Sequence, residues 1–152
     1  ARVIVTSSSD AKLQRARELG AADGINYREW PEWDARVLEI TGGRGVDHVV
    51  EVVGGENLNR SLNAIRMGGT ISIVGLLGGT RAPVETFFIA SKSARVLGIE
   101  VGSREMFEEM NAAMATHQLR PVVDRVFGWD EVPAALRHLE AGAHFGKVVV
   151  RL

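Results

Sequence analysis

The amino-acid sequence predicts an α/β fold built on a parallel sheet, and two observations support this prediction. Short runs rich in Val and Ile alternate with segments whose apolar residues recur at helical spacing, which is typical of strands joined by crossover helices. One run, residues 47–53, is apolar enough to be covered on both faces, as strands of parallel sheets are. At 152 residues the chain has the size of one domain.

The first elements follow this alternation directly. A strand is predicted at residues 2–6, and any of the three serines at 7–9 can cap the helix predicted at 10–19, which should stop at Gly20. The inward face of this helix is expected to consist of Leu13, Ala16 and Leu19. A short strand is predicted next, near residues 24–27.

The middle of the chain continues the pattern. A helix is predicted from Pro31, because proline suits the first turn of a helix, and the strand at 47–53 should break at Gly54-Gly55. The spacing of three apolar residues then predicts a helix that ends at Gly68-Gly69; they are Leu58, Leu62 and Ile65. Strands are expected at 70–74 and 95–101.

From Ser103 onward the pattern becomes mainly helical. One predicted helix carries an apolar stripe of Met106, Phe107, Met110, Ala113 and Met114. Another, at about 130–141, carries Val132, Ala135, Leu136 and Leu139. Because both stripes have helical spacing, we expect them to lie in the core. A final strand is predicted at 147–151.

Composition excludes several classes of function. A formal net charge of −1 gives no reason to expect nucleic acid or an acidic membrane as a partner, and no apolar stretch has the length of a membrane helix. The absence of cysteine removes disulfides, thiolate nucleophiles and cysteine-rich zinc sites. Cytoplasm is the default expectation. Because the chain begins inside an apolar run, we expect it to be a piece of something longer.

Five ordered segments carry a resemblance to a known family. They are residues 12–21, 24–29 (Gly-Ile-Asn-Tyr-Arg-Glu), 45–55 (Gly-Val-Asp-His-Val-Val-Glu-Val-Val-Gly-Gly), 67–75 (Met-Gly-Gly-Thr-Ile-Ser-Ile-Val-Gly) and 146–150. Together they span essentially the whole chain and resemble the medium-chain dehydrogenase/reductases, in particular zinc-type alcohol dehydrogenases and quinone oxidoreductases. The resemblance implies a partial dinucleotide-binding domain over 1–152, with Rossmann strands and helices in 1–102 and C-terminal helices and a final strand in 103–152.

The resemblance also indicates what the chain lacks. It covers only the part of a Rossmann domain that comes after the glycine-rich turn, whose backbone N–H groups would bind the pyrophosphate. The fold is therefore expected to be a doubly wound sheet without its first βα unit. In the usual strand order the absent strand lies between the strands at 2–6 and 47–53, so both should have unpaired edges, which favour aggregation, segment swapping or rearrangement.

One group of site residues is implied by the resemblance at the end of the first two strands. NAD-preferring relatives place an acidic side chain where this chain has Ser7, and a carboxylate would repel a 2′-phosphate. Lys12 and Tyr27 match positions that hold the 2′-phosphate in NADPH-dependent quinone oxidoreductases. The resemblance thus implies NADP as cofactor, with NAD as the second choice. The alternative interpretation is that the serines only cap a helix and that Lys12 is a solvated lysine.

A second group matches loops that line the nicotinamide and its ribose; its members are Val53, Gly54, Val74, Gly75 and Leu76. Ile99 and Val101 match a segment that meets the carboxamide, and Lys147 matches a cationic residue near the pyrophosphate. The alternative is that the glycines form ordinary strand-end turns.

No catalytic or metal-binding group is predicted. The four histidines lack ligand spacing, and His48, inside a strand, is expected to be structural. Glu51 has no partner carboxylate and is expected to satisfy backbone donors at its strand end. Trp30 and Trp33 have mainly acidic neighbours, which favours surface packing over base stacking.

The sequence therefore predicts the cofactor-binding segment of an NAD(P)H-dependent oxidoreductase that acts on a carbonyl, alcohol or quinone-type small molecule and is inactive as this chain alone. The resemblance also implies a homodimer whose subunits pair at residues 95–99. In zinc-containing relatives the metal ligands come from the N-terminal domain, so this chain does not test for zinc. The alternative is a non-catalytic or S-adenosylmethionine-binding Rossmann module, which Ser7 disfavours because such modules prefer an acidic ribose contact.

Overall fold

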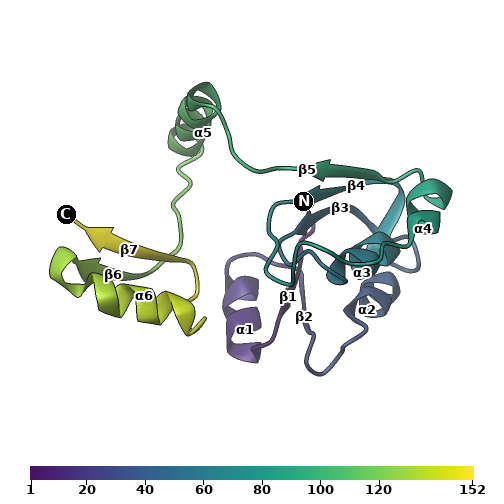
Figure 1. Cartoon of the computed structure of the whole chain (residues 1–152), viewed down its shortest axis with the longest axis horizontal. Helices are drawn as coiled ribbons and strands as arrows, with labels where there is room; N and C mark the ends of the chain where they lie inside the picture. The colour runs from purple at the N-terminus through teal and green to yellow at the C-terminus, as the bar shows by residue number, and fades with distance from the viewer. The chain divides into compact units, whose positions relative to one another are not determined.

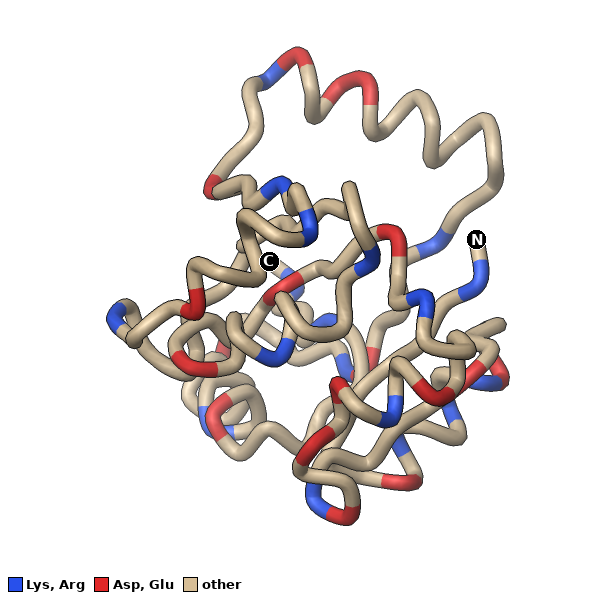
Figure 2. The backbone as a smooth tube through the Cα atoms, turned by 90° about the vertical axis from the view of Figure 1, so that its right-hand side faces the viewer, with Lys and Arg blue, Asp and Glu red and all other residues tan.

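A computed structural model describes all 152 residues, which divide into two compact units, residues 1–101 and 102–152 (Figure 1). Each unit combines helices with parallel strands. The predicted α/β class, an incomplete Rossmann-type fold with parallel strands, is therefore confirmed. Acidic and basic residues are interspersed along the backbone, in keeping with the low net charge (Figure 2).

The first unit begins with two strands and two helices in alternation: β1 (Ile4–Ser7), α1 (Asp10–Glu18), β2 (Asp23–Asn26) and α2 (Trp33–Ile40). The Ser9 side chain caps α1 by accepting a hydrogen bond from the backbone N–H of Lys12. Leu13 is buried as expected, but the prediction that Leu19 faces inward was wrong, because α1 ends at Glu18 and Leu19 is 60% exposed at its C-cap.

The same unit continues with β3 (Val46–Glu51), α3 (Asn57–Ala64), β4 (Ile65–Ile73), α4 (Thr86–Ser91) and β5 (Arg95–Gly98). The prediction that the third helix runs to Gly68-Gly69 was wrong. Ile65 already has extended backbone and begins β4. Its side chain still reaches the core, with 1% exposed, so the apolar spacing alone did not distinguish helix from strand.

The strands of this unit form two separate sheets. β1 pairs only with β2, and the three remaining strands pair in the order β3-β4-β5. β1 and β3 are not paired with each other, which is where the absent strand was expected. Each of these two strands therefore has one edge without a strand partner.

Leu62, Ile65 and Ile71 form the core of the larger sheet, and α3 and α4 add Leu58, Phe88 and Ile89. These helices cover one face. The prediction that residues 47–53 are covered on both faces was wrong, since Val50 and Val52 are 65% and 47% exposed. The reason is that successive side chains of a strand point to opposite faces of the sheet, and only one face of this sheet is covered by helices of this unit.

The second unit contains α5 (Arg104–Thr116), β6 (Val123–Gly128), a 3-10 turn (Trp129–Glu131), α6 (Val132–Glu140) and β7 (Lys147–Arg151). β6 and β7 pair in parallel, and Phe127 and Ala135 are its buried apolar residues. The prediction that the α5 stripe lies in the core was wrong, because no residue of α5 is buried. Within this unit the helix that packs on the strands is α6, of which Ala135 is buried while Leu136 and Leu139 are exposed.

An ion pair between buried Asp34 and half-buried Arg60 joins α2 to α3 in the first unit. The Asp34 carboxylate accepts hydrogen bonds from Arg60 (2.7 Å) and Asn63 (2.8 Å), and its side chain is 11% exposed. Burial alone raises the pKa of Asp34, but the hydrogen bonds from Asn63 and Arg60 outweigh burial and hold the pKa below its ordinary value.

We expect Asp34→Asn to lower the free energy of unfolding by about 1–3 kcal/mol at pH 7, because Arg60 loses its charged partner. Since the folded-state pKa of Asp34 is depressed, its stabilisation is present above about pH 4 and is lost as the pH falls through the folded pKa. Urea unfolding of both proteins at pH 7 and pH 3 measures this. A difference that is unchanged or larger at pH 3 would contradict the assignment.

Candidate functional site

The first part of the candidate site is the β1–β2 corner, formed by Ser7, Lys12 and Tyr27. Parallel pairing places Ser7 opposite Asn26, and the backbone N–H of Tyr27 donates to the carbonyl oxygen of Ser7 at 3.0 Å. The Ser7 Oγ accepts a hydrogen bond from the N–H of Ser9 at 3.3 Å. This hydroxyl therefore keeps its own proton to donate to an acceptor.

Of the residues of the corner, Lys12 lies in the first turn of α1, and Tyr27, directly after β2, is 44% exposed. A side-chain contact that the sequence did not predict ties the two elements together. The Asn26 amide donates to Asp10 at the start of α1 at 2.9 Å and accepts from the backbone N–H of Arg28 at 3.1 Å. The corner thus also contains an acidic residue, Asp10, two positions before Lys12 in α1. The position of Asp10 directly after the capping Ser9 was the sequence signal that could have identified it.

The second part consists of the β3–β4 turns, residues 52–55 and 74–79. The N–H groups of Val74 and Gly75 both donate to the carbonyl oxygen of Glu51, and the N–H of Gly78 donates to that of Val53 at 2.6 Å. Gly75 lies so close to the facing turn that a Cβ there would be 2.2 Å from the Val52 carbonyl oxygen. The two turns are therefore joined backbone to backbone, and only glycine fits at position 75.

Apolar side chains remain exposed around these turns. Val53, Val74 and Leu76 are 37%, 49% and 54% exposed at the carboxyl ends of β3 and β4. The N–H of Ile99 donates to the carbonyl oxygen of Ile73 at 2.8 Å, which places Ile99 beside the end of β4. Val101 is highly exposed at the end of the first unit. The structure thus brings together Ile99 and the predicted residues at the ends of β3 and β4, whereas no hydrogen bond joins Val101 to them.

The carboxylate of Glu51, 2% exposed, is held at the base of the β3–β4 turns. Its Oε1 accepts from the backbone N–H groups of Val53 (2.8 Å) and Gly54 (2.9 Å). The Asn57 amide donates to both oxygens, and the Ser61 hydroxyl donates to Oε2. The prediction that Glu51 satisfies backbone donors is confirmed, whereas its side-chain partners in α3 were not predicted.

Lys147 belongs to the second unit, unlike the rest of the predicted site. It begins β7, is exposed, and its backbone N–H donates to the carbonyl oxygen of Val122 at 2.8 Å. The structure thus anchors its backbone within the β6–β7 pair.

The histidines have structural partners or are scattered. His48 Nε2 lies 2.8 Å from the Ser72 hydroxyl on the neighbouring strand, and His138 Nε2 lies 2.8 Å from Asp124 Oδ2. A hydrogen bond from the Phe145 backbone N–H and one with the His138 side chain lower the pKa of Asp124. These bonds connect β6 with α6 and with the loop before β7. No three metal-ligating side chains meet in the structure.

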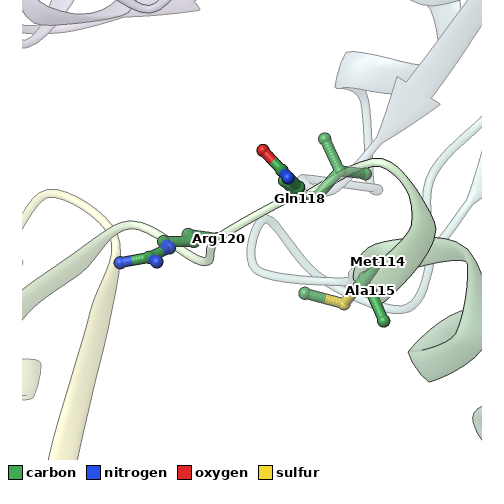
Figure 3. Close-up of a pocket in the computed structure, with 5 residues that line it drawn as sticks. Met114, Ala115, Gln118 and Arg120 are labelled. Carbon is green, nitrogen blue, oxygen red and sulfur yellow. The ribbon is translucent and has the colours of Figure 1, made fainter.

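A hollow of about 420 Å³ lies at the end of α5 and is lined by Met114, Ala115, Gln118, Leu119 and Arg120. In Figure 3 the side chains of Met114, Gln118 and Arg120 point in different directions and do not converge on a common point. The hollow contains no predicted site residue.

The fold and the turns at the carboxyl ends of the strands define an α/β domain of the incomplete Rossmann type. A family model for zinc-binding dehydrogenases matches residues 1–116, so the chain belongs to the zinc-binding dehydrogenase family. The chain is 39% identical to a zinc-type alcohol dehydrogenase-like protein of Schizosaccharomyces pombe, over 100% of this chain and 45% of that protein. It is 29% identical to quinone oxidoreductase-like protein 2 of Bos taurus, over 100% and 46% respectively. These are relatives of the alcohol dehydrogenase and quinone reductase type, as the resemblance implied.

Solved structures agree with this assignment. An alcohol dehydrogenase-type structure from Sinorhizobium meliloti matches with a TM-score of 0.92 and 45% identity over 100% of this chain and 44% of that one. An NAD-dependent alcohol dehydrogenase matches with a TM-score of 0.85 and 31% identity over 100% of this chain and 44% of that one. A mycobacterial protein in complex with NADPH matches with a TM-score of 0.78 and 26% identity over 99% of this chain and 50% of that one. A nicotinamide cofactor is therefore supported for the family.

The chain spans less than half the length of the curated relatives it matches. None of its helices is long and apolar enough to cross a membrane.

Proposed function

We propose that this chain is the NADPH-preferring cofactor-binding part of an oxidoreductase that transfers hydride to or from a carbonyl, alcohol or quinone-type small molecule. The observation that carries the proposal is the hydroxyl of Ser7 at the end of β1. Its oxygen accepts from Ser9 N–H at 3.3 Å, so its proton is available to a 2′-phosphate. A carboxylate at this place would instead favour an unphosphorylated ribose.

The other residues of the β1–β2 corner fit the same ligand. Lys12 provides a cation and Tyr27 a phenol, while the backbone hydrogen bond from Tyr27 to Ser7 keeps the two strand ends together. Asp10 opposes a phosphate, but the Asn26 amide holds its carboxylate at 2.9 Å. The proposed preference for NADPH over NADH therefore depends on the balance between the positive charge of Lys12 and the negative charge of Asp10.

The β3–β4 turns fit the other end of the cofactor. Exposed Val53, Val74 and Leu76 would form an apolar wall for the ring, and the glycine backbones permit close approach. When bound, the nicotinamide supplies the hydride chemistry, and the protein orients it. We assign no catalytic acid or base among the residues of the proposed cofactor site, and we propose that this chain is inactive by itself.

We further propose a homodimer in which the β5 strands pair edge to edge, with neither nucleic acid nor a membrane as partner, and cytoplasm as location. β5 pairs only with β4 and leaves its other edge without a strand. The small-molecule substrate would meet the nicotinamide in a cleft between this domain and a catalytic domain that is not part of this chain.

The proposal predicts a change of cofactor preference in Ser7→Asp. We expect NADPH binding to weaken by about 10–100-fold relative to NADH, because a charge-assisted contact is worth roughly 1.5–3 kcal/mol and the new carboxylate repels the phosphate. Titration of each nucleotide by ligand-observed NMR measures the ratio in this chain, where weak affinity is expected without a pyrophosphate loop.

Ser7→Asn is the matched control, because it introduces a side chain of the same size and shape as that of Asp but without the negative charge. It should lower NADPH affinity less than Ser7→Asp does. An unchanged NADPH-to-NADH ratio in Ser7→Asp would refute the 2′-phosphate assignment. Saturable binding of S-adenosylmethionine without binding of NADPH would refute the oxidoreductase proposal in favour of a different Rossmann module.

A further inference from the structure

Glu51 is a buried charge that the proposed function leaves unused. It is 2% exposed, and it forms no salt bridge with a lysine, arginine or histidine. Burying an ionised carboxylate is costly unless hydrogen bonds compensate for the lost water. A neutral residue of similar size, such as leucine or glutamine, could fill this place in the core without the free-energy cost of burying a charge. The presence of a carboxylate here therefore needs a specific explanation.

All the donors to this carboxylate come from one small region. Two are the N–H groups of Val53 and Gly54 in the turn after β3, and the others are Asn57 and Ser61 in α3. The backbone N–H groups of Val53 and Gly54 converge on a single oxygen, Oε1. Both N–H groups can point at the same oxygen only if the turn keeps its conformation, in which Gly54 has a φ of +67°.

The main chain of the same residue holds the second turn. The Glu51 carbonyl oxygen accepts from Val74 N–H at 2.8 Å and from Gly75 N–H at 3.2 Å. One residue therefore joins both β3–β4 turns and α3, through its carboxylate on one side and its carbonyl on the other. A shift of the first turn is transmitted to the second, because Gly75 has no free space beside the Val52 carbonyl oxygen.

We propose that Glu51 is a positioning residue for the nicotinamide end of the cofactor. It acts by holding the Val53–Gly54 turn, and through it Gly75, in the conformation that accepts the ring. The adenosine end, at the β1–β2 corner, belongs to a different sheet and does not contact Glu51. The inference rests on the proposed function, and it predicts that loss of the carboxylate affects one end of the ligand selectively.

The test compares Glu51→Gln with the unchanged chain, using NADP⁺ as probe in saturation-transfer NMR. We expect the ratio of nicotinamide to adenine proton signals to fall at least about twofold, and the Kd for NADP⁺ to rise by about tenfold. Binding of adenosine 2′,5′-bisphosphate, which lacks the ring, should change by less than about twofold. The ratio within one ligand is insensitive to the fraction of folded protein.

Asp34→Asn is the matched control, since it also turns a buried carboxylate of this unit into an amide but lies outside the turns. It should leave the proton ratio unchanged. Ser61→Ala, which removes a single donor, replaces Glu51→Gln if that variant does not fold, with a smaller change in the same direction.

An unchanged ratio in the folded variant, or equal weakening of NADP⁺ and adenosine 2′,5′-bisphosphate, would overturn the proposal for Glu51 while leaving the proposed function standing. Failure of the unchanged chain to bind either probe would instead overturn the proposed function, and this inference with it.

Discussion

Gly75→Ala is expected to lower the free energy of unfolding by roughly 3 kcal/mol, because overpacking against rigid backbone cannot be relieved by a side-chain rotation. The added Cβ would lie 2.2 Å from the Val52 carbonyl oxygen and 2.9 Å from its carbon. Both atoms belong to the main chain. Accommodation therefore requires the β3–β4 turns to separate, which would also disturb the proposed nicotinamide end.

Gly98→Ala is the matched control for this prediction. Gly98 ends the adjacent strand β5, pairs with Ile73, and has no atom within 4 Å of the position that an added methyl group would take. Chemical denaturation of the two variants should show a large loss only for Gly75→Ala. Equal losses of unfolding free energy in the two variants would mean that the destabilisation comes from replacing glycine in the backbone and not from the steric contact with Val52.

Leu62→Ala is expected to cost about 2–5 kcal/mol of unfolding free energy, since it leaves a cavity in a core that closes only partly. Leu62 is 0% exposed and packs with Ile65 and Ile71 between α3 and the larger sheet. The substitution should also loosen α3, which carries Asn57 and Ser61 toward Glu51.

Leu97→Ala provides the comparison, because Leu97 lies on β5 of the same sheet but is 50% exposed. Urea unfolding should show a loss of less than about 1 kcal/mol for this variant. A similarly small loss in Leu62→Ala would contradict the assignment of Leu62 to the core.

Much of the local structure could be predicted from residue types alone. The final strand at 147–151 was predicted with both ends correct, and the helix after Ser9 begins at the predicted residue, Asp10. In both cases the signal is local: a β-branched run in one, and a capping hydroxyl before a helical pattern in the other. Leu58, Leu62 and Ile65 show the limit of such signals, because the same spacing spans a helix and the start of β4.

The candidate site likewise contains residues that the sequence could identify and residues that it could not. Ser7, Tyr27 and the strand-end glycines could be found from where strands stop, and their positions at carboxyl ends of strands are as the resemblance implies. Asp10, Asn57 and Ser61 could not be found this way. Their importance depends on which side chains they meet, and those partners lie several to many residues away in the chain.

By itself, the sequence determined the alternation of strands and helices, the parallel class of the sheet and the family, because periodicity and short motifs are properties of neighbouring residues. Only the tertiary structure decided that β1 and β3 remain unpaired with each other, that α5 buries no residue, and that Glu51 joins two turns and a helix. These features depend on contacts between distant segments. Such contacts are set by packing and by the satisfaction of buried polar groups, which no local pattern encodes.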